Sequence, residues 1–345
     1  YETGNPVTQI FTDNSDMLWY GSDEGIVRKD RNSGKEQRFV HDPLDPASIS
    51  NDRIGALYQD RQGVIWVGTG SGLNRFDPKI GKFVRQVFNG QGIGRLLKSN
   101  IGAIYEDRRG SLWIGIAEEG AGLIRKDRQS DDLKHYPHNP DDTTSFSIGE
   151  VYRIFEDLSG TLWIGTRGGG LNRFIPKTGK FQRFLAGANI HNLWQDSENI
   201  LWVGTSSGLY RSNSEMSAFS RFTGPNSELA ENLIVNGVLE DDEKALWINA
   251  SIGICKINPG RDEVLIFSRY NDPSFYNGTG SYKAKTGELF FGGGSGYFTF
   301  FPQEINANSK APEIVLSDFR IADKSMVSGV TGSPLKTPLS QTKEI

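Results

Sequence analysis

The sequence predicts an all-β fold, a seven-bladed β-propeller with four antiparallel strands per blade, and two observations support this prediction. First, six of the seven tryptophans recur at spacings of 47, 47, 50, 39 and 45 residues, and each has an aspartate six positions before it. Second, apolar and polar residues alternate between these anchors, as they do in half-buried strands. Repeats of this length made of short strands are typical of propeller blades. The six pairs are Asp13 and Trp19, Asp60 and Trp66, Asp107 and Trp113, Asp157 and Trp163, Asp196 and Trp202, and Asp241 and Trp247.

The second repeat shows the expected order of elements. Strands are expected over residues 54–60, 64–69, 73–78 and 83–88, separated by the turns RQG, GSG and KIGK. The aspartate ends the first strand, where its carboxylate can accept backbone N–H groups of the hairpin turn. Three positions later the turn needs a residue that tolerates positive φ, and the repeats hold Asp16, Gly63, Gly110, Gly160 and Asn199 there, with Lys244 as the exception. The tryptophan on the second strand is expected to fill the wedge between neighbouring blades.

The seventh repeat is degenerate, and the chain changes character after it. Phe290 takes the tryptophan position and Ala284 replaces the aspartate. We therefore expect the propeller to occupy residues 1–302. A polar linker over 303–310 would follow, and then the truncated start of a β-sandwich domain over 311–345 with a strand at 313–321.

Composition excludes several classes of function. The net charge is −4 and no basic cluster is present, so nucleic acid is not an expected partner. This piece has no run of 18 apolar residues and no charged-then-apolar leader, so neither a membrane span nor a signal peptide is expected within it. The single Cys255 cannot form an internal disulfide. No cofactor motif is found, and the pair His135 and His138 lacks further ligands for a metal.

Several segments resemble known repeats. Residues 100–127 (NIGAIYEDRRGSLWIGIAEEGAGLIRKD) and 147–184 resemble the two-component regulator propeller repeat, and residues 311–326 (APEIVLSDFRIADKSM) resemble the start of the Y_Y_Y-type β-sandwich that follows such propellers. The resemblance implies a non-enzymatic, ligand-sensing periplasmic region of an inner-membrane receptor. It also implies that the ligand is an oligosaccharide or another small molecule. The implied partners are the rest of that receptor, namely the sandwich, a membrane helix and a cytoplasmic histidine kinase, often hybrid, or diguanylate cyclase.

The strand order selects one face for a ligand. The loops after the Trp strand and the loops between blades share this face, and the charged residues Glu118, Glu119 and Arg167 break an otherwise Gly/Ser pattern there. The innermost strands begin at the same face and line the axial channel. Aromatic rings and amide or guanidinium donors at these positions suit a sugar ring and its hydroxyls. The expected channel-mouth residues are Arg53, Asn100, Glu150, Tyr152, Asn189, His191 and Asn236.

Three alternatives stay open from the sequence. The first is a glycan hydrolase or lyase, for which Glu150 and His191 are the only acid–base pair that the channel mouth offers. The second is an interaction platform whose blade rims form a homodimer or dock onto a second propeller. The third is that the loop charges are simply solvated. The matching loops that begin at His41 and His138 are interpreted as part of the repeat, because a catalytic constellation would be unique.

Overall fold

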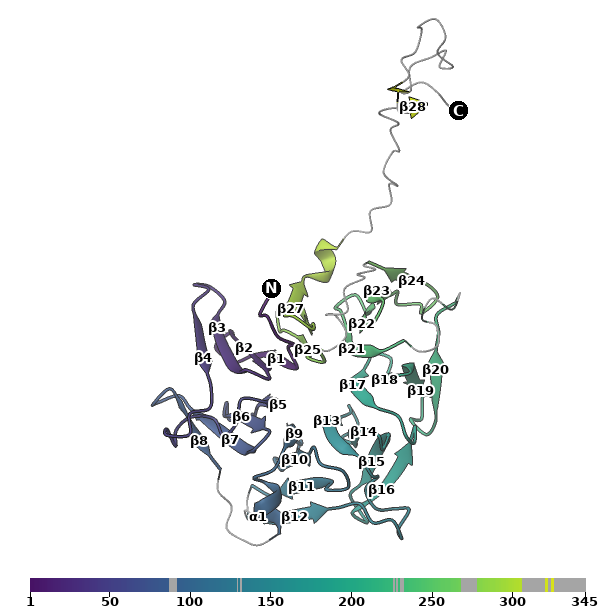
Figure 1. The fold of residues 1–345 in the computed structure, drawn as a ribbon. Coiled ribbons are helices and arrows are strands. Elements are labelled where there is room, and N and C mark those ends of the chain that lie inside the picture. The colour runs from purple at the N-terminus through teal and green to yellow at the C-terminus, as the bar shows by residue number, and fades with distance from the viewer. Residues whose placement is uncertain are drawn as a thin grey trace, which may run out of the picture. The chain divides into compact units, whose positions relative to one another are not determined.

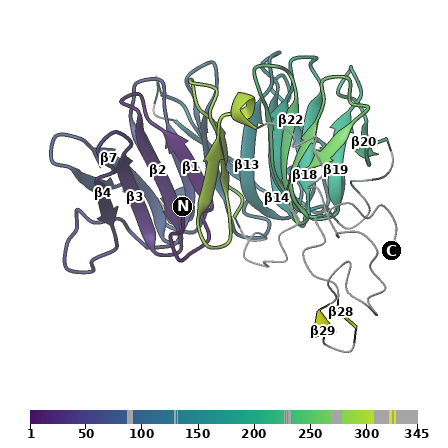
Figure 2. The ribbon, with the colours of Figure 1, turned by 90° about the horizontal axis from the view of Figure 1, so that it is seen from above.

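The computed structural model shows a ring of small antiparallel sheets around a central axis (Figure 1). It describes residues 1–86, 92–128, 130, 132–225, 227, 229, 233–267 and 278–305, and the backbone of 320–321 and 324–325. The innermost strand of each blade faces the axis, and successive strands lie further out (Figure 1). Seen from the side, the strands run across the thickness of the ring (Figure 2). The predicted seven-bladed β-propeller is confirmed.

Each of the first six blades is a sheet of four strands in sequence order. The first three are β1 (Gln9–Thr12), β2 (Met17–Ser22), β3 (Gly25–Asp30) and β4 (Glu36–Phe39); β5 (Ile54–Gln59), β6 (Ile65–Thr69), β7 (Gly72–Asp77) and β8 (Lys82–Arg85); and β9 (Ile101–Glu106), β10 (Leu112–Ile116), β11 (Leu123–Lys126) and β12 (Leu133–Tyr136). The next three are β13 (Glu150–Glu156), β14 (Leu162–Arg167), β15 (Leu171–Ile175) and β16 (Lys180–Phe184); β17 (Ile190–Gln195), β18 (Leu201–Thr205), β19 (Gly208–Ser212) and β20 (Phe219–Phe222); and β21 (Val235–Glu240), β22 (Leu246–Ala250), β23 (Gly253–Ile257) and β24 (Val264–Ile266).

The seventh blade differs from the prediction. Its sheet holds three described strands, β25 (Ser281–Lys283), β26 (Leu289–Gly292) and β27 (Tyr297–Phe300), rather than four. Its outer edge pairs with the first residues of the chain, since Glu2 lies opposite Gly296 in an antiparallel bridge. The Tyr297 amide donates to the Tyr1 carbonyl at 3.1 Å. The ring therefore closes between the first residues of the chain and blade 7. The two segments are far apart in the sequence and pair only once, so no repeated pattern predicts their contact.

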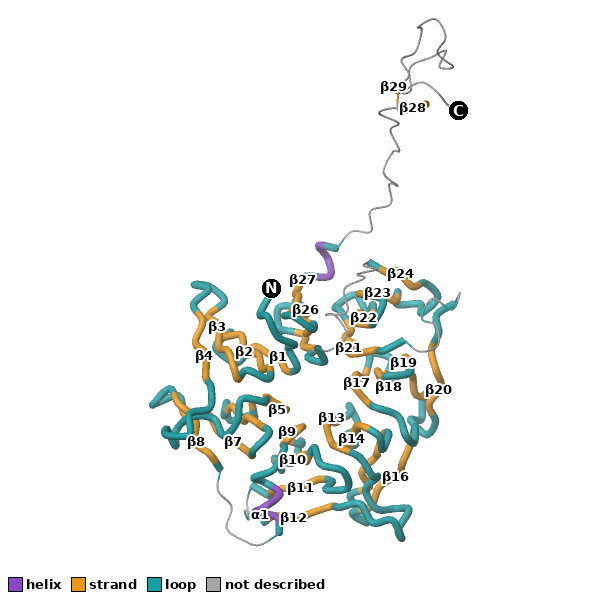
Figure 3. The backbone as a smooth tube through the Cα atoms, viewed as in Figure 1, coloured by secondary structure: helices purple, strands orange, loops and turns teal. Residues whose placement is uncertain are grey.

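Loops and turns connect the strands, and helix is rare in the described part of the chain (Figure 3). A short helix α1 (Ile93–Leu96) precedes blade 3, and a 3-10 turn η2 (Pro302–Glu304) follows β27. The chain divides into a compact unit Tyr1–Ile305 and a second unit Asn306–Ile345, which contains the paired strands β28 (Arg320–Ile321) and β29 (Lys324–Ser325). The predicted linker and sandwich fall almost entirely outside the described residues. None of the helices in the described part of the chain has the length and apolar character to cross a membrane.

The Asp–Trp repeat has one geometry in all six blades. One carboxylate oxygen accepts backbone N–H groups of the turn, as expected, and the other accepts the indole Nε1–H of the tryptophan at 2.6 to 2.8 Å. The turn residue has positive φ at every predicted position, and Lys244 adopts it too, with φ of 68°. The repeated spacing is therefore explained by a buried hydrogen bond as well as by the packing of the indole.

The core lies between adjacent blades. The tryptophans of blades 1 and 3 to 6 are fully buried, and Phe290 is buried at the equivalent place in blade 7. Trp113 packs with Tyr136 from its own blade and Phe174 from the next, at centroid distances of 5.6 and 5.0 Å. Trp194 joins the apolar clusters between blades, so its role is packing. Large rings in these wedges hold each blade at a set angle to the next.

Candidate functional site

The innermost strands share an irregularity at the mouth of the axial channel. The register of five of them shifts by one residue against the second strand of the blade, so that one residue bulges out of each ladder. Bulges re-aim side chains, and the sequence pattern does not reveal them. The bulged residues are Gly55, Gly102, Tyr152, His191 and Asn236.

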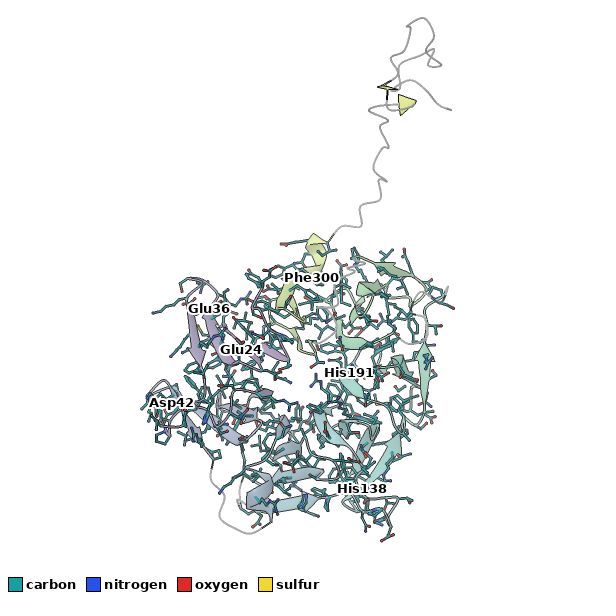
Figure 4. All side chains as sticks on the ribbon, in the orientation of Figure 1. Glu24, Glu36, Asp42, His138, His191 and Phe300 are labelled. Atoms are coloured by element: carbon teal, nitrogen blue, oxygen red, sulfur yellow. The ribbon has the colours of Figure 1, made fainter. Side chains whose placement is uncertain are left out.

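The two glycines and the three larger residues divide the channel into unlike halves. A Cβ at Gly55 would lie 2.3 Å from the Ile101 carbonyl oxygen, and a Cβ at Gly102 would lie 2.2 Å from that of Val151. Blades 2 and 3 thus pack backbone against backbone and project no side chain from the bulge. In blades 4 to 6 the bulge carries Tyr152, His191 and Asn236, and His191 points to the central opening (Figure 4).

Interacting side chains gather on this second half of the mouth. Glu150 is paired with Arg167 across β13 and β14, and their charged atoms are 3.9 Å apart. Burial raises the pKa of Tyr152, and the adjacent Glu150 carboxylate adds to this, while Arg53 and Arg167 act in the opposite direction. We use the name mouth cluster for Glu150, Tyr152, Arg167, His191 and Asn236 of blades 4 to 6 together with Arg53 of blade 2, whose charge acts on Tyr152.

His191 is the most strongly perturbed group of the mouth cluster. Burial, followed by the positive charge of Arg153, lowers its pKa to about 4, and the neighbouring Asn236 acts in the opposite direction. The imidazole is therefore neutral near pH 7. Seven buried side-chain atoms in the described part of the chain have no hydrogen-bond partner, and two of them, His191 Nδ1 and Glu150 Oε2, lie in the mouth cluster. Glu150 Oε2 has the Arg167 guanidinium 3.9 Å away but makes no hydrogen bond with it. Unpaired buried polar atoms are costly, so these two are positions where a ligand or water can bind favourably.

Four predicted residues are not joined to the mouth cluster by any hydrogen bond or ion pair in the described part of the chain. Asn100 donates to the Ala117 carbonyl of its own blade at 3.4 Å. Asn189 accepts from the Ser206 amide through its backbone. Glu118 and Glu119 are exposed on the loop after β10. Their part in binding stays a prediction.

The sequence reasoning missed the residue that reaches furthest across the channel. Arg153 follows the bulge in blade 4, and its Nε donates to the His191 carbonyl at 2.5 Å, Nη1 to the Tyr152 carbonyl at 2.7 Å and Nη2 to the Thr279 carbonyl of blade 7 at 3.0 Å. The same position in the other blades holds only uncharged residues, namely Gln9, Ala56, Ala103, Asn192, Gly237 and Gly280. A cation at a repeat position that is otherwise uncharged was the available signal.

The histidine loops have the structural role that was predicted for them. His41 Nδ1 lies 2.8 Å from the Ile49 carbonyl oxygen, and His138 Nδ1 lies 2.8 Å from that of Phe146. The labelled Asp42 and His138 lie toward the outside of the ring, well away from His191 (Figure 4). The same bond in two blades indicates that the loops are built as repeats.

Comparison with known families agrees with the repeat geometry. The model of the two component regulator propeller matches residues 48–71 and 95–117. These segments contain the first two strands of blades 2 and 3, together with both Asp–Trp pairs. Two segments of the chain thus match the two component regulator propeller repeat. Over 81 residues the chain is 33% identical to histidine kinase P4 of Formosa agariphila, a match that covers 24% of the chain and 6% of the kinase.

Two solved structures show the same fold. The extracellular domain attributed to the hybrid two component system BT3049 of B. thetaiotaomicron has a TM-score of 0.70 to this chain at 20% identity, over 86% of this chain and 40% of that one. Streptogramin B lyase has a TM-score of 0.62 at 14% identity, over 86% of this chain and 93% of the lyase. At these identities the similarity shows the fold alone. This chain spans less than half of the first structure.

Proposed function

We propose that this propeller is the ligand-sensing part of a bacterial signalling receptor and lies on the periplasmic side of the inner membrane. The repeat family supports this proposal, and so does the local similarity to a histidine kinase. The shared fold with an extracellular receptor domain is consistent with it. The remaining parts of the receptor would carry the sandwich, the membrane helix and a kinase or cyclase output.

The ligand we propose is a neutral oligosaccharide that binds at the mouth cluster. The observation that carries this proposal is a pair of buried atoms without a hydrogen bond beside the half-buried ring of Tyr152. They are His191 Nδ1 and Glu150 Oε2, and the latter has only the Arg167 charge 3.9 Å away. A sugar hydroxyl can donate to the carboxylate while the ring packs on the apolar face of the sugar. The exposed Arg53 and Arg167 would border the site.

Turnover of the saccharide is the alternative, and the state of His191 argues against it. A general base works best when its pKa is near the working pH, whereas the pKa of His191 is lowered to about 4. We therefore propose binding without chemistry, with the saccharide released unchanged.

A calorimetric titration against a panel of oligosaccharides tests the proposal. We expect at least one to bind, to be recovered intact, and to bind about tenfold or more weakly to Glu150→Gln, because that change replaces a charged acceptor. Glu243→Gln is the matched control, since Glu243 is exposed on the Asp-turn face and contacts its own turn. If binding survives Glu150→Gln but is lost in Glu119→Gln, the site lies on the outer loops instead. A consumed saccharide would establish an enzyme.

A further inference from the structure

We infer that the axial channel holds a second site, beneath the mouth cluster, where Arg153 binds a small oxyanion such as sulfate or a carboxylate group. The inference stands on the channel wall and does not depend on the saccharide proposed for the mouth. It concerns a residue whose position in the repeat is occupied by Ala or Gly in four other blades.

The guanidinium of Arg153 is held in place by backbone alone. Its three hydrogen bonds go to carbonyl oxygens of blades 4, 5 and 7, so the group is fixed at the centre of the ring. A guanidinium has five N–H donors in a planar fork, so two remain for another acceptor. The side chain keeps some accessible surface because it faces the lumen, although protein surrounds it.

The positive charge of Arg153 has no acidic partner among the described residues. Burial removes the guanidinium from water, and this is the main reason that the pKa of Arg153 is lowered to about 10. A buried charge costs free energy unless it is paired, and Arg forks suit oxyanions because two N–H groups can meet two oxygens. His191, whose backbone carbonyl accepts from Arg153, has an imidazole that is neutral near pH 7 and supplies no counter-charge. An anion in the lumen would compensate Arg153.

The channel has room for this anion. A space of about 160 Å³ lies beside Arg153, and blades 2 and 3 line it with Ala56, Leu57, Gly102, Ala103 and Ile104. One water needs about 10–15 Å³ on this measure, so the space holds several atoms. Asn192 and Ser281 border it as well and hydrogen-bond each other at 2.6 Å. On the opposite wall the bulged residues are Gly55 and Gly102, which have no side chains to fill the lumen across from the Arg153 guanidinium.

Calorimetry and thermal unfolding at constant ionic strength test the site, with chloride exchanged for sulfate or acetate. We expect saturable binding that weakens about tenfold or more in Arg153→Gln and is partly kept in Arg153→Lys. Arg173→Gln is the control, because Arg173 packs over Trp163 on the outer part of the same blade. Equal binding to wild type and Arg153→Gln would overturn the inference.

A second experiment distinguishes a free oxyanion from the carboxylate of a larger ligand. Binding of glucuronate is compared with binding of glucose. If glucuronate alone binds, and if Arg153→Gln abolishes that binding, the bound oxyanion is the carboxylate of a larger ligand. Failure of sulfate, acetate and glucuronate together would overturn the inference. If Arg153→Gln does not fold, crystals of the unchanged protein soaked in selenate show whether an oxyanion binds at Arg153. An anomalous peak within hydrogen-bonding distance of the guanidinium supports the site, and its absence at saturating selenate refutes it.

Discussion

At the scale of single residues, each aspartate of the repeat accepts hydrogen bonds both from the backbone of its turn and from the tryptophan six residues later. In blade 4, Asp157 Oδ1 accepts from the amides of Ser159 and Thr161, and Oδ2 accepts from Trp163 Nε1 at 2.8 Å. The aspartate is buried, so every donor that loses it stays unpaired. The sequence predicted the turn contacts, because they are local. The indole bond also has a local cause, since six residues along a hairpin return the chain to the carboxylate.

Replacing this aspartate should be costly. We expect Asp157→Ala to lower the free energy of unfolding by about 3 kcal/mol or more, because it leaves buried amides and one indole N–H without an acceptor. Trp163→Phe, which removes the indole N–H and keeps a large ring, should cost less. Denaturant unfolding of both variants checks this. A loss below about 1 kcal/mol for Asp157→Ala would show that water replaces the carboxylate.

The state of His191 predicts a pH dependence. Its pKa is lowered from 6.5 to about 4, so between these values the unfolded chain binds more protons than the folded one. The free energy of unfolding should therefore fall as the pH falls from 6.5 through 4. The ring carbon shifts of His191 in NMR should titrate near pH 4, and His191→Gln should remove part of this slope. Titration near 6.5 would contradict the burial of the ring.

At the scale of elements, the interblade loops were predictable and the closure of blade 7 was not. Arg85 donates from its Nε to the Ser48 carbonyl, and Arg183 does the same to Ser145, so the two loops are held alike. Repetition along the chain revealed that equivalence. The bridge between Glu2 and Gly296 joins opposite ends of the sequence, where no repeat unit exists to signal it.

The outer edge of blade 7 offers a direct test of closure. A Cβ at Gly296 would lie 2.0 Å from the Tyr1 carbonyl oxygen, whereas at Gly293 its nearest contact is 3.5 Å away. Gly296→Ala should therefore speed hydrogen exchange of the Tyr297 amide and lower the free energy of unfolding by about 1–3 kcal/mol. Gly293→Ala in the same hairpin is the control. Equal exchange in both variants would mean that the first residues do not stabilise the ring.

At the scale of the whole molecule, arginines join three of the blade junctions. Each comes from the turn after the third strand and reaches an acidic residue of the preceding blade in the ring. The pairs are Arg31 with Glu288, Arg128 with Asp60, and Arg261 with Asp196. The residues of these pairs are 257, 68 and 65 positions apart. Because repeat 7 lacks the Asp–Trp pair, the sequence predicts that the junction of blades 1 and 7 is the weakest of the ring. This stays a prediction, and the ion pair of Arg31 with Glu288 acts against it.

Removing one of these arginines should weaken the ring. The side chain of Asp60 has no exposed surface, so Arg128→Met would leave a buried charge without its partner. We expect the free energy of unfolding to fall by about 3 kcal/mol or more. Lys82→Met, which removes the exposed ion pair with Asp45, should cost less than about 1 kcal/mol. Similar losses in both variants, measured by denaturant unfolding, would show that the junction pair is solvated.

The sequence by itself determined the propeller, the order of its strands and the turn chemistry. It could do so because each of these depends on contacts within one repeat, which recur until they are visible. Only the tertiary structure decided which side chains share the channel. Bulges turn Tyr152 and His191 toward the axis, and Arg153 crosses to Thr279, 126 positions along the chain. Each of these contacts occurs only once, where different blades meet, so no repeated sequence pattern predicts it.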